Sequence, residues 1–322
     1  MAEPRIVIGT PADVGRCCAL ASLLEVSASP KPGNVHRFSR PEDHKKSYEQ
    51  FLSAIAAMTP HYASSAETAY HLARSKQDIK TAMHLGNIIE ATCESMMAAQ
   101  TGGNLLLGHV LLLIPLAASI GTLLAGTERS IGALKSVVGE VVRSGNTDDV
   151  ISLYKGIKIC NPGGLGTVEK FDVNSPGFVA ELRKAKATFH DVFAITKDVD
   201  SISSEWSSGF AITFTDTFPR LHAIVSSGLT INDAVVQLFL ETLAKHPDSL
   251  IRRKNGLDMA KSISDQAREI IELGGMNELA GRNAVNALDT KLASAGGRLN
   301  PGTTADLAAA ALCLLVATGY KP

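Results

Sequence analysis

LLLGHVLLLIPLAASIGTLLAG, residues 105–126, is the uncharged stretch of sequence that decides the fold. It is long enough to span a lipid bilayer, and His109 is its one titratable side chain. A helix that is apolar all round is either a membrane span or the core of a helical protein. Because no second span and no aromatic belt accompany it, we predict a buried central helix. Leu307–Thr318 is too short to span a bilayer and is predicted as a second buried helix.

The composition is that of a globular protein. The chain has 322 residues, of which 45% are apolar, 20% charged and 5% aromatic, so a large core built mainly from Ala, Leu, Ile and Val is expected. A net charge of -1 provides no basic excess for a nucleic-acid polymer, although a small nucleotide needs only a few local cations. The five cysteines show no Cys-x-x-Cys spacing, which argues against a disulfide framework or a zinc ribbon. Since Met1–Cys18 carries no secretory pattern, a cytoplasmic protein is expected.

Most of the chain shows the periodicity of helices. Phe210, Ile212 and Phe214 alternate as in a strand, but Phe210, Phe214 and Phe218 also form a helical stripe, and no second strand offers a partner, so this segment is predicted as helix. The remaining predicted helices cover 13–25, 51–58, 66–73, 79–99, 130–142, 178–192, 231–243, 262–273 and 281–293. The sequence therefore predicts an all-α protein.

Gly and Pro are concentrated in a few polar junctions between these helices. The junctions lie at 29–33, 102–108, 162–166, 254–256 and 296–302. Breakers of this kind let backbone amides approach a ligand, and five of them in one apolar helical chain favour a shared site. Arg143–Asp149 is the best linker candidate, but such junctions lie on both sides of it. We therefore expect one large helical domain, residues 1–322, with its active site at Gly/Pro-rich helix junctions.

The standard nucleotide-binding and hydrolase signatures are missing from the sequence. It contains no Gly-x-x-x-x-Gly-Lys-Ser/Thr, and the glycines at 163–166 do not complete Gly-x-Gly-x-x-Gly. No Gly-x-Ser-x-Gly elbow is present either. P-loop, Rossmann and α/β-hydrolase enzymes are therefore disfavoured.

The first junction combines one cation with a rigid turn. It follows Glu25, and its Pro-Lys-Pro-Gly turn places Lys31 beside small polar groups, a combination that suits a polyphosphate. Glu25 is expected in the last turn of the preceding helix, where the helix dipole disfavours a carboxylate. A partner such as Mg²⁺ would explain it there, and a solvated helix end is the alternative.

Two later stretches combine charge with a helix end. Asp248–Gly256 contains three consecutive cations, which a solvated surface would also explain. In Leu299–Leu307, Thr303 or Thr304 is placed to cap the last helix, and Asp306 would then lie in its first turn. There Asp306 either matches the helix dipole or takes a proton or a metal beside a bound phosphate.

Glu25 with Pro30–Gly33, Asp248–Gly256 and Asn300–Leu307 together resemble the triphosphoribosyl-dephospho-CoA synthase family. That family has a helix ending in Glu before Pro-Lys-Pro-Gly, then Asp-Thr-Asn-Leu-Leu-His-Arg-Gly-Gly, then Ser-Pro-Gly-Gly-Ser-Ala-Asp-Leu. Pro-Gly and Ala-Asp-Leu of the last string are unchanged here. The resemblance covers Ala19–Thr318, nearly the whole chain.

Two loops depart from the family pattern. Its Gly-Thr-Asn-Thr-x-x-Gly loop corresponds to Gly102–Gly108, where Asn104 and Gly108 are kept and Gly103 and Leu105 replace the threonines. The loop at 161–172 looks more like divergent members from archaea and some methylotrophic bacteria. An acceptor other than dephospho-CoA therefore stays open.

The resemblance implies a helical enzyme that joins ATP to 3′-dephospho-CoA or a related cofactor precursor and releases adenine. An oxocarbenium-like transition state needs a carboxylate, the attacking hydroxyl a base and the departing adenine a proton. Glu25, Asp306 and His36 are accordingly the expected catalytic residues. Mg²⁺ on the triphosphate is expected to meet Glu25, Asp248 and Asp306, with Asp43 an alternative ligand.

The residues expected to bind ATP all lie in the polar junctions. They are Lys31, Gly33, Asn34, Asn104, Gly108, Arg253, Lys254, Gly302 and Thr303. The expected partners are small molecules, with no nucleic-acid polymer and no membrane, and a homodimer is left open. Three other hypotheses stand beside this one: a helical kinase or nucleotide hydrolase, a regulatory nucleotide-binding protein without catalysis, and a membrane-associated protein.

Overall fold

The computed structural model describes residues 3–322, apart from the side chains of residues 43, 44, 80 and 81. In the first half of the chain the helices are α1 (Pro11–Ser27), α2 (Pro41–His44), α3 (Tyr48–Arg74), α4 (Ile79–Ala82), α5 (Leu85–Ala98), α6 (Leu107–Leu124), α7 (Ile131–Val141) and α8 (Thr147–Cys160). In the second half they are α9 (Phe178–Ala185), α10 (Phe189–Ala194), α11 (Ser201–Ser208), α12 (Phe218–Ser226), α13 (Ile231–Lys245), α14 (Ser249–Asn255), α15 (Leu257–Glu272), α16 (Leu279–Ala293) and α17 (Gly302–Ala317). A π-helical turn, Thr213–Thr217, and a 3-10 turn, Gly275–Asn277, complete the set.

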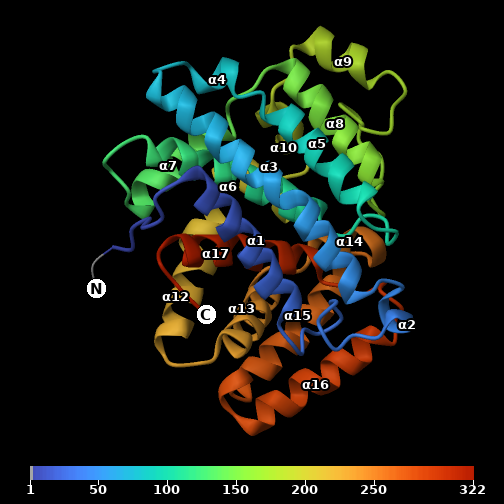
Figure 1. Ribbon diagram of the computed structural model, residues 1–322. Coiled ribbons are helices and arrows are strands. Elements are labelled where there is room, and N and C mark those ends of the chain that lie inside the picture. Colours follow the sequence, from blue (N-terminus) through green and yellow to red (C-terminus); the bar gives the residue numbers. More distant parts are fainter. Residues whose placement is uncertain (1–2) are drawn as a thin grey trace.

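This architecture confirms the predicted all-α fold. Among the described residues, the extended pairing is limited to an isolated bridge between Arg5 and Ser130. Figure 1 shows α3 crossing the front of the molecule, α5 and α8 on one side of it, and α12, α13, α15 and α16 on the other. One continuous cluster of buried side chains reaches from Ile6 to Ala317, as expected for a single helical domain.

The apolar stretch that decides the fold becomes the central helix α6. By length and composition α6 could cross a membrane, but 83% of its residues are buried inside the protein. It packs against α1, α3, α5, α7 and α17. The structure therefore buries this stretch as a core helix, as the sequence predicted.

Two residues of α6 require particular neighbours. Pro115 has no amide hydrogen for the carbonyl of Leu111, and the indole nitrogen of Trp206 in α11 donates to that carbonyl at 2.9 Å. Gly121 lies so close to α3 that a Cβ there would be 2.1 Å from the carbonyl oxygen of Ala66. A side chain at Gly121 would push α3 and α6 apart.

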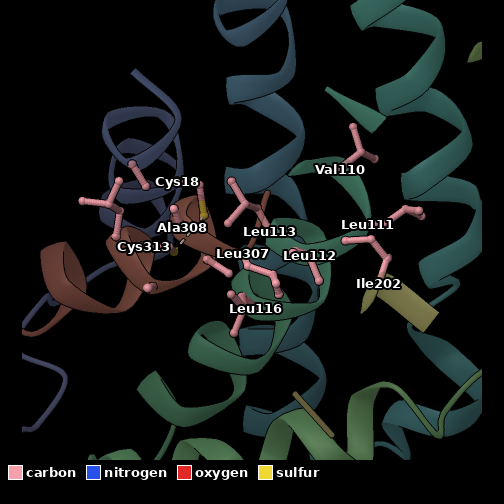
Figure 2. Close-up of a cluster of buried hydrophobic side chains, with 14 of the residues drawn as sticks. Cys18, Val110, Leu111, Leu112, Leu113, Leu116, Ile202, Leu307, Ala308 and Cys313 are labelled. Atoms are coloured by element: carbon pink, nitrogen blue, oxygen red, sulfur yellow. Dashed lines mark hydrogen bonds between the residues drawn. The ribbon is translucent and has the colours of Figure 1, made fainter. Parts of the chain in front are cut away.

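The last helix, α17, is the second buried helix and packs against α1 and α6. Figure 2 shows Leu307, Ala308 and Cys313 of α17 among side chains of α6, with Cys18 of α1 beside them. The sulfurs of Cys18 and Cys313 are 3.5 Å apart, and all five cysteines are buried free thiols. The first turns of α17 are thus held at the end of the core where the polar junctions meet.

The helix boundaries differ from the sequence predictions in several places. The two helices predicted at 51–58 and 66–73 are one continuous helix, α3, which contains Pro60. The helix predicted at 79–99 breaks at His84, which has a left-handed backbone, and the one predicted at 178–192 breaks at Lys186. Helix α8 was not predicted, and Asp248–Gly256, predicted as a loop, contains α14.

The linker candidate at 143–149 is a tight junction between two helices. Asn146 caps α8, and Asp149 accepts a hydrogen bond from the backbone amide of Asn146 in return. Asp149 also accepts a bond from the amide of Gly86 at 3.0 Å, which joins α5 to α8. A flexible domain boundary would not be tied to a neighbouring helix in this way.

Candidate active site

A cavity of about 770 Å³ lies where the polar junctions meet. Its lining comes from the last turn of α1, from the first turns of α6 and α17, and from α8, α10, α11 and α14. Its lining includes polar side chains, such as Glu25, Arg253 and Asp306, and apolar ones, such as Ile157, Phe171 and Phe193. The cavity can therefore take a ligand that combines charged groups with a large apolar part.

A buried ion pair lies next to the cavity and fixes the positions of two of its lining residues. Lys31 is completely buried, and its ammonium group donates hydrogen bonds to Glu25 and, at 3.0 Å, to the side-chain oxygen of Asn34. Asn34 in turn donates to the side chain of Asn300 at 2.9 Å, which ties the first junction to the last. Burial raises the pKa of Glu25 and lowers that of Lys31, while their mutual attraction opposes both shifts.

Lys31 does not line the cavity, unlike Glu25 and Asn34. Its ammonium group is already bonded to a carboxylate and an amide, so it is not free to bind a phosphate. We therefore do not propose that Lys31 binds ATP. The residue instead holds Glu25 and Asn34 in place.

Gly33 and His36 also lie outside the cavity lining. The amide of Gly33 donates to one oxygen of Asp289 at 3.0 Å, and the Nε2 atom of His36 is 3.0 Å from the other oxygen. These contacts fasten the first junction to α16. We therefore do not carry forward the predicted roles of Gly33 in binding ATP and of His36 in proton transfer.

Asp306, in the second turn of α17, lines the cavity and has 17% of its side chain exposed. It packs against Gly108 so closely that a Cβ on Gly108 would be 1.9 Å from a carboxyl oxygen. Burial, together with the charges of Glu25 and Asp248, raises the pKa of Asp306 well above its usual range. A glycine is therefore required at Gly108 for Asp306 to occupy its position.

His109 stands beside Asp306 and was not predicted as a site residue. Its Nε2 atom is 3.6 Å from Asp306 Oδ1 and 3.7 Å from Glu25 Oε2. Burial, with a smaller effect from Lys31, lowers the pKa of His109 to about 3, so the ring is neutral. The one signal in the sequence was a titratable side chain inside an apolar helix, and that pattern is also common in ordinary cores.

Asp248 has a structural position. It caps α14 by accepting hydrogen bonds from the amides of Leu250 and Ile251, and its other oxygen accepts two bonds from Thr304, from the amide at 2.8 Å and the hydroxyl at 2.9 Å. It does not line the cavity. Its four bonds join the starts of α14 and α17.

The residues predicted to hold a metal do not form a metal centre. In the part of the chain that the structure describes, no group of three His, Cys, Asp or Glu side chains could hold an ion. Asp248 is occupied as a helix cap, and one carboxyl oxygen of Glu25 is bonded to the ammonium group of Lys31. The alternative ligand Asp43 has a side chain outside the described part. We therefore assign no metal to these residues.

Four cations line the cavity. Arg253 and Lys254 lie at the end of α14, and Lys45 and Lys46 precede α3. Arg253 forms an ion pair with Asp200, but its Nε atom is buried without a hydrogen-bond partner among the described residues. Burial, with a smaller effect from the charge of Lys254, lowers the pKa of Lys46 to about 8. Such a group is arranged to receive an anion.

Lys46 is a cavity residue that the sequence analysis missed. Its ammonium group donates to the backbone oxygen of Asn104 at 2.5 Å, so the segment before α3 is joined to the start of α6. Asn104 itself lines the cavity, and its side-chain oxygen accepts a bond from the amide of Leu107, the first residue of α6, at 3.2 Å. The adjacent Lys45 also lines the cavity, and no pattern in the sequence distinguished either lysine.

The other predicted ATP-binding residues meet at this cavity. Asn34, Asn104, Gly108, Gly302 and Thr303 all contribute to its lining, together with Arg253 and Lys254. The hydroxyl of Tyr154 donates to the carbonyl of Phe171 at 2.6 Å, and this hydrogen bond joins α8 to the loop that follows it.

Comparisons with known proteins identify the family of this chain. A family model described as ATP:dephospho-CoA triphosphoribosyl transferase, CitG, matches residues 11–320. The chain belongs to this family. It is therefore a transferase of the triphosphoribosyl-dephospho-CoA synthase type, as the sequence resemblance implied.

Two curated relatives in the CitG family have a similar length. A Vibrio cholerae protein, a candidate 2-(5″-triphosphoribosyl)-3′-dephosphocoenzyme-A synthase, is 25% identical over 302 residues, which is 93% of this chain and 86% of its own. The 2-(5″-triphosphoribosyl)-3′-dephosphocoenzyme-A synthase of Pectobacterium atrosepticum is 23% identical over 300 residues, with 92% and 86% covered. The relationship therefore covers the whole helical core.

A solved structure supports the fold. The crystal structure of a candidate triphosphoribosyl-dephospho-CoA synthase from Archaeoglobus fulgidus superimposes with a TM-score of 0.60 at 21% identity. It covers 84% of this chain and all of the other chain. At this identity the likeness concerns the arrangement of the helices alone.

Proposed function

We propose that this CitG-family protein transfers the triphosphoribosyl group of ATP to a hydroxyl group of dephospho-CoA or a related cofactor precursor and releases adenine. The observation that carries the proposal is that one cavity is lined both by four cations and by the carboxyl groups of Glu25 and Asp306. Lys46, Arg253 and Lys254 suit a triphosphate, and Glu25 and Asp306 suit the reacting ribose. We expect the protein to act in the cytoplasm.

The cations have few partners in the protein. Arg253 is paired with Asp200, whereas among the described residues Lys46 donates only to a neutral carbonyl group. An anion of several charges would complete the hydrogen bonding of the buried Arg253 Nε atom. The proposed triphosphate therefore lies against α14 and the segment before α3.

The two carboxyl groups differ in their surroundings, and we assign them different roles. Lys31 holds Glu25 in its ionised form, so Glu25 can stabilise positive charge that develops on the ribose as the bond to adenine breaks. Burial and the charges of Glu25 and Asp248 raise the pKa of Asp306, which favours its protonated form. We propose that Asp306 is the acid that donates a proton to the departing adenine.

Magnesium enters this proposal only with the nucleotide. A magnesium ion on a triphosphate usually keeps several water ligands and needs few protein ligands. The described residues offer no metal centre of their own, and no step is assigned to the ion.

The apolar residues that line the cavity support an acceptor that is more than a simple alcohol. Ile157, Phe171 and Phe193 offer a surface for an extended apolar or ring-containing group. Dephospho-CoA, with its nucleotide and its long pantetheine arm, has both kinds of group. A related cofactor precursor with one ring system and one hydroxyl would meet the same requirements.

The test is a product analysis. The purified protein is incubated with ATP, Mg²⁺ and dephospho-CoA or other candidate acceptors, and the bases and nucleotides are separated by chromatography. Free adenine together with an acceptor of increased mass supports the proposal. Release of ADP or AMP would instead indicate a kinase or a hydrolase, and ATP binding without turnover on any acceptor would indicate a regulatory protein.

A further inference from the structure

His109 has a buried nitrogen atom without a partner at the centre of the proposed active site. The residue is 1% exposed and lines the cavity, and among the described side chains its Nε2 atom is one of the few buried polar atoms that make no hydrogen bond. A buried polar atom without a hydrogen bond lowers the stability of the folded protein, so its position next to two carboxyl groups calls for an explanation.

The hydrogen bonds of Ser22 determine which nitrogen of His109 carries the proton. The hydroxyl of Ser22 donates to the carbonyl of Cys18 at 3.1 Å. Its oxygen is 3.1 Å from His109 Nδ1 and therefore accepts the hydrogen of that nitrogen. In a neutral ring the second nitrogen, Nε2, then has a lone pair and no hydrogen. His109 consequently presents an acceptor to the cavity.

The groups that face this lone pair differ in what they can offer. Glu25 Oε2, at 3.7 Å, belongs to a carboxylate that is paired with Lys31 and has no proton to donate. Asp306 Oδ1 is at 3.6 Å, and within the described residues no donor reaches the Asp306 carboxyl group. Arg253 and Asp248 act on Asp306 only through their charges. A largely enclosed carboxyl group without donors from these residues is shifted towards its protonated form, and His109 Nε2 is a suitable acceptor for that proton.

We propose that His109 is a positioning residue that accepts a hydrogen bond from the protonated Asp306 and thereby keeps this acid oriented at the reacting ribose. The proposal rests on the function proposed above. The present separation of 3.6 Å is longer than a hydrogen bond, and a small rotation of the Asp306 side chain closes it. Gly108, which precedes His109, leaves the space that Asp306 occupies.

The proton balance of the reaction is then complete. The bond between C1′ of the ribose and N9 of adenine breaks, and its electron pair goes to the base. Asp306 gives its proton to that base and becomes a carboxylate. The acceptor hydroxyl forms the new bond to C1′, and the proton it loses restores Asp306. His109 gains and loses no proton, because it acts only through Asp306.

Two substitutions separate the acceptor role from a general structural role. In His109→Gln the side-chain oxygen can reach the position of Nε2, whereas in His109→Asn the side chain can still bond to Ser22 but places no acceptor near Asp306. Adenine release is measured with both variants, with Asp306→Asn, and with the double variant His109→Asn/Asp306→Asn. Circular dichroism and the melting temperature identify any variant that does not fold.

The expected result is a fall in kcat of about 10- to 100-fold for His109→Asn, with the KM for ATP changed less than about twofold. His109→Gln should retain most of the activity, and His109→Asn should have no further effect in the Asp306→Asn protein. Equal activity of the Gln and Asn variants, or full additivity in the double variant, would overturn the proposal. If the wild-type protein releases no adenine at all, the proposed function fails instead.

A spectroscopic measurement tests the same contact without turnover and without a His109 variant. In protein labelled with nitrogen-15 in its histidines, one ring should stay neutral with its proton on Nδ1 between pH 5 and 8 (about the range in which free histidine titrates). The Nε2 resonance of this ring should move when Asp306 is changed to Ala. A buried ring with its proton on Nε2, or a resonance that ignores Asp306→Ala, would contradict the proposal.

Discussion

Gly108→Ala tests whether the position of Asp306 matters for activity. The added Cβ would lie 1.9 Å from Asp306 Oδ2 and 2.1 Å from its Cγ, whereas real Cβ atoms approach other atoms no closer than 3.0 Å. The carboxyl group must therefore move by about 1 Å or more. A displacement of this size at a reacting group reduces the rate by about 100-fold.

The same substitution is not expected to unfold the protein. Gly108 lies at the start of α6, and Ala is favoured over Gly in a helix by about 1 kcal/mol. The atoms that the new methyl group meets belong to one side chain that borders a cavity, so they can rotate away. We expect a melting temperature close to that of the wild type together with a large loss of kcat.

The assay is adenine release at saturating ATP, with thermal unfolding followed by circular dichroism. Gly126→Ala is the matched control, because its Cβ would have a single neighbour, at 3.8 Å, and lies far along the chain from Asp306. A folded Gly108→Ala protein with the kcat of the wild type would refute the reasoning, since Asp306 would then not need its observed position.

Three further predictions concern buried charges. Lys31→Met should lower the free energy of unfolding, measured by urea denaturation, by about 3 to 5 kcal/mol, because it leaves Glu25 buried without its cation. An unchanged stability with a raised KM for ATP would instead indicate that Lys31 is a phosphate ligand. The apparent affinity for ATP should fall as the pH rises through about 8, where the ammonium group of Lys46 loses its proton, and Lys46→Arg should remove this dependence in a calorimetric titration. Burial raises the pKa of Glu205 from 4.5 to about 8, so the folded protein retains this proton and loses stability as the pH rises from 4.5 to about 8. The free energy of unfolding should fall by about 3 kcal/mol by pH 7. The same dependence of this free energy on pH in the wild type and in Glu205→Gln would contradict the prediction.

The sequence determined the fold class and the identity of several site residues. An uncharged stretch at 105–126 without a second span favours the central helix of a helical protein over a membrane span, and this inference needed no knowledge of its neighbours. Glycine and proline at helix ends are constrained by local backbone geometry, so the junctions and their polar residues could be read directly. Asn34, Asn104, Gly108, Arg253 and Asp306 were found in this way, and all of them line the cavity.

Tertiary structure alone decided which charges face the cavity and which support it from behind. Lys31 and Lys46 are both lysines near a helix end, yet Lys31 is enclosed with Glu25 while Lys46 reaches the cavity. Asp248 was predicted to bind a metal, but it caps α14, and its second oxygen accepts a hydrogen bond from Thr304, which is distant in the sequence. His109 was hidden in the apolar stretch that decides the fold. The properties of a charged or titratable side chain depend on burial and on partners distant in the sequence, and only the packed helices supply these.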